Sequence, residues 1–364
     1  MNIILEEEKP AGINTTSKPS NPSIDDELKE FLNRILPKII VVGAGGAGNN
    51  TLNRLSANGL ADSTTIAVNT DAQDLLKIKS KKKILIGKEL TRGHGAGSYP
   101  EIGEAAALES IDEIRKSVEG NDIVFLTCGM GGGTGTGSLP IIAEQAKRSG
   151  VLTIAIVTVP FAMEGKKRYE NAIRGLMKLE KNVDSMIIIS NDKLLELYPN
   201  LPMSQAFLMA DMLLSNSIQG IIEMITKPGI VNLDLADLKT IIKDMGYSII
   251  LVGESMNSMK ARDAIESAMK NPLFEIDYSG AKGALINIIG GEEMRLSEAK
   301  TIIGQIIKSI GSDTRLIWGA QLDKAMNNKV KVMAVITGLP RERFEKYFDF
   351  KSYKFDLDVD VALK

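Results

Sequence analysis

From residue 38 onward, short runs of apolar residues alternate with longer segments whose apolar residues recur at helical spacing. Runs of the first kind are typical of strands buried on both faces, and segments of the second kind are typical of amphipathic helices. Six strands are predicted in the first half of the chain, at residues 39–42, 65–68, 84–86, 123–126, 152–159 and 186–189. Helices are predicted in most of the gaps, notably at residues 101–118, 139–149 and 169–181. This alternation predicts an α/β fold with a Rossmann-like parallel sheet and helices on both faces.

A long helix, residues 204–226, is predicted next. It is apolar nearly all round, so we expect it to be buried on most sides, and a Lys-Pro-Gly sequence ends it. The second α/β domain is predicted to contain helices at residues 235–245, 259–269 and 297–309, and strands at residues 247–252, 284–289, 315–318 and 330–336. The last two strands follow each other directly, which favours an antiparallel pair and therefore a mixed sheet. Residues 353–362 alternate like an edge strand.

The two ends of the chain differ from its middle. Residues 1–22 are rich in Pro, Ser, Asn and Thr and are expected to form a disordered arm. Residues 23–37 are predicted to form a short helix that begins at Ser23 and ends at Pro37. The domains expected are therefore the arm, this helix, a first domain at 38–203, the connecting helix at 204–227 and a second domain at 228–364.

Composition narrows the class of protein. The formal net charge of −2 argues against a broad nucleic-acid-binding face, and the basic residues 79–83 are expected to form a solvated turn. A single cysteine, Cys128, excludes an internal disulfide and suits a reducing cytosol. The acidic N-terminus lacks the pattern of a signal peptide, and no apolar run is long enough to cross a membrane. We therefore expect a soluble cytoplasmic protein with no nucleic acid partner and no direct membrane insertion.

The segment 129–138, GMGGGTGTGS, carries the clearest chemical signal. It follows a predicted strand and precedes a predicted helix, and it has almost no Cβ atoms to keep a ligand from the backbone. Backbone N–H groups, threonine hydroxyls and a helix N-terminus together favour a phosphate group. Glycines that serve packing alone are the alternative, but an ordinary turn needs only one or two of them.

Two further glycine-rich segments follow strands, so all three should lie at the same edge of the sheet. Residues 43–50 match the G-x-G-x-x-G dinucleotide fingerprint, and Asp71 stands where a ribose-binding acid is expected, so an NAD-dependent oxidoreductase remains an alternative. Two loops rich in N–H donors suit a longer polyphosphate better than they suit a single pyrophosphate. Residues 93–100 form the third loop, which could sense a terminal phosphate. It contains His94, the only histidine, which is expected to be solvent-exposed rather than catalytic and leaves no histidine-based metal cluster.

The glycine loops, together with Val-Asn-Thr-Asp at 68–71, Gly-Ala-Gly at 95–97, the EGKKR sequence at 164–168 and the segment 227–237, resemble the FtsZ family, the tubulin-like GTPases of prokaryotic cell division. The resemblance covers about residues 38–340 and implies the tubulin/FtsZ fold. It implies bound GTP or GDP, with Mg²⁺ held through the phosphates and no metal site made by the protein. The residues that it places at the GTP site are Gly45, Gly46, Ala47, Gly48, Asn50, Asp71, Ala96, Gly97, Gly133, Thr134, Gly135, Thr136, Glu164, Arg168, Asn191, Phe207 and Asp211.

The acidic pair Asp234 and Asp237 lies at a predicted helix start. From the residues alone, they can be first-turn carboxylates that the helix dipole favours by about 0.3–1 kcal/mol each. The resemblance implies instead that they are catalytic, with Asn232 beside them, and act on the GTP of the adjacent subunit. Such a head-to-tail contact propagates as a filament. A tubulin-like scaffold with little turnover is the alternative that these acids argue against.

The partners implied are other copies of the chain and division adaptor proteins, in a ring at the division site. Many bacterial members of the family end in a long linker and an adaptor-binding peptide, whereas this sequence ends at Lys364 without one. The N-terminal arm and helix are therefore expected to be an alternative docking element.

Overall fold

The computed structural model of the chain describes residues 36–59, 63–197, 199, 200, 202–256, 260–270 and 276–347. The elements below belong to the unit formed by residues 37–364. The predicted arm at 1–22, the predicted N-terminal helix up to residue 35 and the predicted terminal strand at 353–362 lie outside the described residues.

One ten-stranded sheet runs through this unit, in the order β3-β2-β1-β4-β5-β6-β7-β10-β8-β9. Its first six strands are mutually parallel, and all six were predicted from the sequence. They are β1 (Ile39–Ala44), β2 (Thr64–Asn69), β3 (Lys82–Leu85), β4 (Ile123–Gly129), β5 (Leu152–Val159) and β6 (Ser185–Ser190). The strands β1, β4, β5 and β6 are buried over nearly their whole length, which explains their continuous apolar runs.

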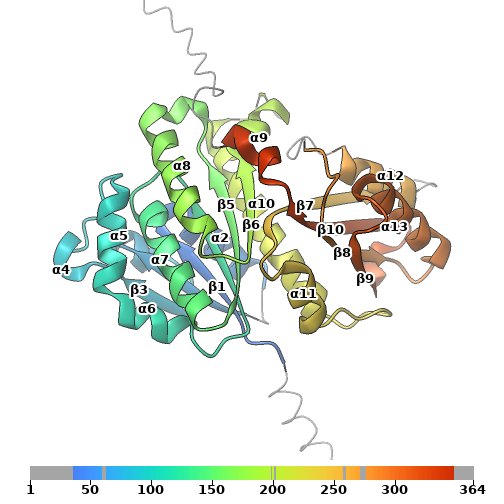
Figure 1. The fold of residues 1–364 in the computed structure, drawn as a ribbon, viewed down its shortest axis with the longest axis horizontal. Coiled ribbons are helices and arrows are strands. Elements are labelled where there is room, and N and C mark those ends of the chain that lie inside the picture. Colours follow the sequence, from blue (N-terminus) through green and yellow to red (C-terminus); the bar gives the residue numbers. More distant parts are fainter. Residues whose placement is uncertain are drawn as a thin grey trace, which may run out of the picture. The chain divides into compact units, whose positions relative to one another are not determined.

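Helices cover both faces of this parallel part. Helices α5 to α8 pack side by side on one face, while α2 packs beside α10 on the other (Figure 1). The bounds of the helices in this half are α2 (Gly45–Ala57), α3 (Ala72–Lys77), α4 (Lys88–Thr91), α5 (Pro100–Glu109), α6 (Ile111–Val118), α7 (Thr134–Arg148), η1 (Ala162–Glu164), α8 (Lys166–Glu180) and α9 (Asn191–Leu197).

One helix of the sequence prediction is two helices in the structure. The segment 101–118 divides at Ser110. The N–H of Ser110 donates to the carbonyls of Ala106 and Ala107 at the end of α5, and its carbonyl accepts from Glu113 N and Ile114 N of α6. Its hydroxyl also accepts a hydrogen bond from Gly87 N at 3.3 Å. Helical periodicity continues across this break, so the pattern alone could not reveal it.

The long helix predicted at residues 204–226 is present as α10 (Met203–Thr226), which follows α9 and precedes α11. Its second half is buried, with Leu214, Ile218 and Ile222 fully covered. Its first half is not, because Phe207 and Met212 are 42% and 46% exposed. The prediction that the helix is buried on most sides is therefore wrong for its N-terminal half.

The second half continues the sheet through a short parallel pairing of β6 with β7. Its elements are α11 (Leu235–Ile242), β7 (Gly246–Ser255), α12 (Lys260–Met269), β8 (Gly283–Gly290), α13 (Leu296–Ile310), β9 (Arg315–Leu322), η3 (Lys324–Met326), β10 (Val330–Leu339) and η4 (Arg341–Tyr347). Strand β10 lies between β7 and β8 and runs antiparallel to both, while β9 pairs in parallel with β8. The mixed sheet was predicted correctly, but the antiparallel pairing of the last two strands was wrong.

Candidate nucleotide site

Two glycine-rich loops lie against each other where β1 and β4 end. Helix α2 begins at Gly45 and α7 begins at Thr134, so each loop passes directly into a helix. A Cβ atom placed on Gly45 would lie 2.9 Å from the backbone nitrogen of Gly135. The hydroxyl oxygens of Thr70 and Thr134 are 2.6 Å apart, which joins the loop after β2 to the same place. Two helix N-termini therefore meet at one edge of the sheet, and their free N–H groups favour a polyphosphate.

Some glycines of these two loops adopt backbone conformations that need glycine, and others border open space. Gly45 has a φ of 67° and Gly131 a φ of 102°, values that residues with side chains rarely adopt. Gly46, in the first turn of α2, and Gly132, just before α7, are different. A Cβ atom added to either would meet no atom within 4 Å. Space for a ligand is therefore left beside both helix starts.

The other residues predicted in these loops have different surroundings. Ala47 is half-buried, Gly48 packs against the end of β4, and Asn50 is exposed on α2. Thr136 is 1% exposed, and its hydroxyl oxygen accepts a hydrogen bond from Gly131 N at 2.8 Å. The Thr136 hydroxyl thus holds the second loop in shape from inside.

The third glycine-rich loop, residues 93–100, contacts both the segment that follows β2 and the loop that precedes α7. Asp71 is the N-cap of α3, with its carboxylate accepting two N–H bonds, and it forms an antiparallel bridge with His94. Ala96 is buried, and a Cβ atom on Gly133 would lie 2.8 Å from the Ala96 Cβ. Gly97 is exposed with a φ of 56°, and His94 is exposed. Asp71 therefore orders the loop that presents Ala96 and Gly97 beside Gly133.

An aromatic ring and a buried acceptor lie beyond the end of β6. Phe207 of α10 meets Phe161, which follows β5, in an edge-to-face contact with ring centroids 5.1 Å apart. Asn191 is 6% exposed, and its Oδ1 atom has no hydrogen-bond partner among the described residues. A buried acceptor without a partner costs about 1–3 kcal/mol, so a ligand that donates to it is stabilised. The exposed face of Phe207 and the Asn191 carbonyl suit a purine base with N–H donors.

Asp211 lies one helical turn beyond Phe207 on α10. Its Oδ2 atom is 3.8 Å from Nε of Arg54 on α2. Burial raises the pKa of the Asp211 carboxyl to about 6, and the Arg54 charge limits that rise. A carboxylate beside Phe207 can accept from two adjacent N–H groups, and guanine presents such a pair whereas adenine does not.

Glu164 and Arg168 lie between the base side and the second loop. Their side chains form an ion pair of 3.1 Å, and Oε1 of Glu164 accepts a hydrogen bond from Phe161 N at 2.9 Å. A Cβ atom on Gly131 would lie 2.8 Å from Cγ of Arg168. The pair therefore bridges the aromatic contact and the phosphate loop, where a ribose or phosphate oxygen could reach it.

The acidic pair is fixed by reciprocal hydrogen bonds at the start of α11. Oδ1 of Asp234 accepts from Asp237 N at 2.8 Å, and Oδ2 of Asp237 accepts from Asp234 N at 3.1 Å. Oδ1 of Asn232 accepts from Gly229 N at 2.7 Å, which closes the preceding loop. Asp234 and Asn232 are exposed.

These acids do not join the glycine loops within one chain. Helix α10 starts beyond the end of β6, and its 24 residues span about 36 Å before the acidic loop begins. Gly246, just after α11, pairs with Ser185 at the start of β6, so α11 ends at the opposite edge of the parallel strands. Figure 1 shows α9 and α11 on opposite sides of α10 in this view. The chain therefore carries the two parts of the candidate site at opposite ends.

Three residues of this region were missed from the sequence. Thr70 ties two loops together, Phe161 supports Phe207, and Arg54 faces Asp211. Thr70 lies in the Val-Asn-Thr-Asp motif and Phe161 lies two residues after the buried strand β5, so both had a local signal in the sequence. The contact of Arg54 with Asp211 depends on tertiary packing.

A protein-built metal site is absent from the described residues, where no three His, Cys, Asp or Glu side chains gather as ligands. The loops offer N–H and hydroxyl donors and therefore suit an anion. A divalent cation fits this donor set only when phosphate oxygens supply its ligands.

Comparison with known proteins agrees with this geometry. Residues 38–199 match the model of the Tubulin/FtsZ family, GTPase domain, and residues 246–340 match that of the FtsZ family, C-terminal domain. The chain is 49% identical over 344 residues to Cell division protein FtsZ 1 of Thermococcus kodakarensis, covering 92% of each chain. This chain belongs to the FtsZ family. It is a tubulin-like GTPase, and the alternative of a nicotinamide-dependent enzyme is set aside.

Further relatives strengthen the FtsZ assignment. Cell division protein FtsZ 1 of Pyrococcus abyssi is 51% identical over 337 residues, covering 93% of this chain and 89% of that protein. A solved structure of an empty FtsZ dimer from M. jannaschii has a TM-score of 0.81 at 47% identity, covering 86% of this chain and 92% of that one. CetZ2 from Haloferax volcanii, at 20% identity and a TM-score of 0.72, shares the fold. The predicted tubulin/FtsZ fold is confirmed.

Proposed function

We propose that this protein is a self-assembling cytoskeletal GTPase that forms head-to-tail filaments in cell division. Each subunit would hold GTP in its glycine loops and supply Asp234 and Asp237 to the GTP of its neighbour. The observation that carries the proposal is the separation of loops and acids by the length of α10, about 36 Å. A second copy can bring them together, whereas one chain cannot.

The nucleotide would lie along the edge described above. The N-termini of α2 and α7 would hold the phosphates, and the loop at Ala96 and Gly97 would meet the γ-phosphate. Phe207 would stack on guanine, with Asp211 and the unpartnered Asn191 Oδ1 as acceptors for its donors. Phosphate oxygens would hold Mg²⁺, which neutralises the charge that develops on them.

Hydrolysis would rest on placement of the attacking water. The reciprocal hydrogen bonds at α11 use one oxygen of each acid. Within the described part of the chain, the other oxygen of each carboxylate has no partner, so it can accept a hydrogen bond from water. The backbone donors of the neighbour's loops would stabilise the transferring phosphoryl group.

Self-association is supported by the solved structure from M. jannaschii, which is that of an FtsZ dimer. The names of the relatives from Thermococcus kodakarensis and Pyrococcus abyssi support a role in division, which would place the protein in a cytoplasmic ring at the division site. No helix in the described ranges has the length and hydropathy to cross a membrane. Division adaptor proteins would then link the ring to other components.

A single-turnover experiment tests the shared site. Asp237→Ala subunits are loaded with GTP that carries a radioactive γ-phosphate and mixed with wild-type subunits in an excess of unlabelled GTP. We expect the label to be released as phosphate when wild-type subunits co-assemble, because they cap the mutant's nucleotide with intact acids. With Asp237→Ala subunits alone, the label should stay in GTP.

Label that remains GTP in co-assembled mixtures would show that the acids act within their own subunit. Wild-type filaments that release no phosphate would favour the scaffold with little turnover. Asp112→Ala is the matched control, because Asp112 is also an exposed acid in a first helical turn, on α6. That variant should hydrolyse its own GTP at the wild-type rate.

A further inference from the structure

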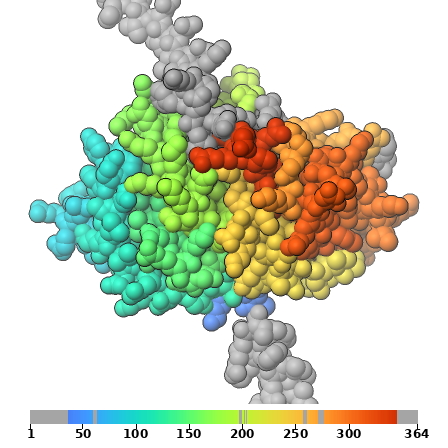
Figure 2. Space-filling model, in the orientation of Figure 1, coloured from blue at the N-terminus to red at the C-terminus, as the bar shows by residue number. Residues whose placement is uncertain are grey.

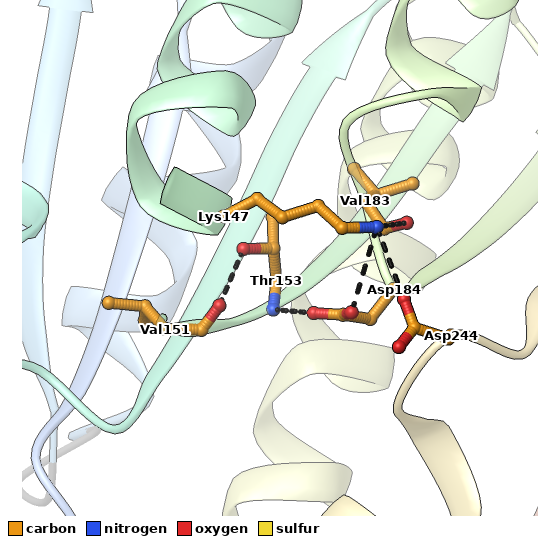
Figure 3. Close-up of polar contacts among 6 residues, drawn as sticks. All are labelled: Lys147, Val151, Thr153, Val183, Asp184 and Asp244. Carbon is orange, nitrogen blue, oxygen red and sulfur yellow. Dashed lines mark hydrogen bonds and ion pairs between the residues drawn. The ribbon is translucent and has the colours of Figure 1, made fainter. Parts of the chain in front are cut away.

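A compact polar cluster lies at the edge of the sheet opposite the nucleotide loops. At its centre is Lys147, in the last turn of α7. Its Nζ atom is 3.2 Å from the carbonyl oxygen of Val183, 3.3 Å from Oδ1 of Asp244 and 3.8 Å from Oδ1 of Asp184. Figure 3 shows the ammonium group between the two carboxylates. One lysine thus connects α7, the start of β6 and the turn after α11.

Asp184 is the anchored member of the cluster. Its side chain is 6% exposed, Oδ2 accepts from Thr153 N at 2.8 Å, and its carbonyl accepts from Gly246 N at 2.9 Å. Burial raises the pKa of Asp184, while the hydrogen bond from Thr153 N and the charge of Lys147 act against that rise. The buried carboxylate therefore needs the nearby ammonium.

Asp244 is the exposed member of the cluster. Its side chain is 63% exposed, and its backbone has a φ of 56° in the tight turn between α11 and β7. Backbone hydrogen bonds from Met245 N to Ile242 O and from Gly246 N to Asp184 O hold the turn, and Lys147 supplies the side-chain contact of Asp244. Loss of that contact would free the Asp244 carboxylate without exposing the core.

Helix α11 otherwise packs on the second half of the chain. Leu238, Ile241 and Ile242 are buried, and Ile241 O accepts a hydrogen bond from Thr337 of β10 at 2.7 Å. Figure 2 shows the yellow surface around α11 directly beside the green surface of the first half. Among the described residues, two side-chain ion pairs cross this boundary at α11 and its following turn. They are Lys147 with Asp244 at 3.3 Å and Lys239 with Asp122 at 4.0 Å, so the Lys147 contact is the closer.

We infer that Lys147 is a positioning residue for GTP hydrolysis in the filament. By holding Asp244 beside Asp184, it sets the end of α11 against the GTPase half and thereby the placement of Asp234 and Asp237 toward the neighbour's nucleotide. The inference rests on the proposed function, because it requires the acids to act on the adjacent subunit. Helix α11 has only eight residues, so a shift at its end reaches its start.

The experiment uses the same labelled GTP and changes only the subunit that offers the acids. Asp237→Ala subunits carry the label, and either wild-type or Lys147→Met subunits cap them. Release should be roughly tenfold slower with Lys147→Met, because hydrolysis depends on sub-ångström placement of the groups around the water. In the reverse arrangement, Lys147→Met subunits carry the labelled GTP and wild-type subunits supply the acids. The label should then be released at the wild-type rate.

Three variants separate positioning from general damage. Lys147→Arg keeps the charge and should restore most of the rate, whereas Asp244→Asn should reproduce the defect and add little to Lys147→Met. Lys178→Met is the matched control, because it removes the 2.6 Å Lys178–Glu104 ion pair between α8 and α5. It should leave the rate unchanged. GTP affinity and filament mass should match those of the wild type in these three variants and in Lys147→Met.

The outcomes distinguish the two proposals. If wild-type subunits fail to release label from Asp237→Ala, the shared site itself is wrong. If wild type releases it and Lys147→Met does so equally fast, only the role of Lys147 is wrong. Equal slowing in both arrangements would also overturn that role, because it would place the defect in the receiving site.

Discussion

Arg54 and Asp211 face each other between α2 and α10, with Nε of Arg54 3.8 Å from Oδ2 of Asp211. Nε of Arg54 is buried and makes no hydrogen bond within the described ranges. This distance gives a charge contact without a hydrogen bond, so it offsets the burial of the carboxylate only in part. The pKa of Asp211 is consequently raised to about 6. Its charge therefore changes just below neutral pH.

GTP affinity should depend on pH through Asp211. Guanine donors need the ionised carboxylate, so affinity should rise as pH increases toward 6 and level off above it. Below that pKa, the loss should approach about tenfold per pH unit, as linkage of one proton requires. Titration with a fluorescent GTP analogue from pH 5 to 8 measures this. Asp211→Asn should bind more weakly and lose the slope; parallel profiles for both proteins would remove Asp211 from the base site.

Gly46→Ala should weaken GTP binding without weakening the free protein. The new methyl group meets no protein atom, and alanine is the better helix former by up to about 1 kcal/mol. If phosphates occupy the space beside Gly46, affinity should fall at least about tenfold because close backbone approach is lost. Gly304→Ala on α13, also into open space, is the control. Equal GTP affinity for both variants would place the phosphates elsewhere.

Gly137→Ala should destabilise the fold. A Cβ atom there would lie 2.5 Å from Glu104 N and even closer to Pro100 O, at the contact between α7 and α5. Forcing the two helices apart should lower the free energy of unfolding by about 1–3 kcal/mol. Denaturant unfolding of the nucleotide-free protein measures it, with Gly304→Ala as the unstrained comparison. An unchanged denaturant midpoint for Gly137→Ala would mean that α5 can move away from α7 without loss of unfolding free energy.

Cys128, the only thiol, should report opening of the nucleotide edge. It is fully buried, burial raises its pKa well above the usual range, and it lies under Gly135. A thiol reagent should label the native protein at least about a hundredfold more slowly than the denatured chain, since the thiolate is the reactive form. Bound GTP should slow labelling further, because it stabilises the native packing in which Cys128 is buried. Fast labelling that GTP leaves unchanged would contradict this packing.

Strand positions were readable because a strand buried on both faces leaves a continuous apolar run. Pairing was not readable in the same way, as β10 demonstrates. Adjacent strands usually form a hairpin, which favoured pairing of β9 with β10. The burial patterns differ, however: β10 is buried along nearly its whole length, whereas β9 is half-exposed, as an edge strand should be. The apolar run at 330–336 was therefore a signal for a central strand.

The phosphate loops were predictable because glycine carries its own conformational signature. The base side was not, since Asn191, Phe207 and Asp211 stand on two helices whose approach depends on the packing of α10 against the sheet. Only the family resemblance located them, and it gave no indication of Arg54. The contact between Lys147 and Asp244 joins residues 97 positions apart and has no local pattern.

The place of β10 also sets an order of events during synthesis. Strands β1 to β6 and their loops are complete once about 200 residues have left the ribosome, because each strand pairs with others already made. Strands β7 and β8 instead keep unpaired edges until Val330–Leu339 arrives between them. Helix α11 packs on β8, β9 and β10. The growing chain thus acquires its nucleotide loops well before the helix that carries Asp234 and Asp237 has a finished sheet to rest on.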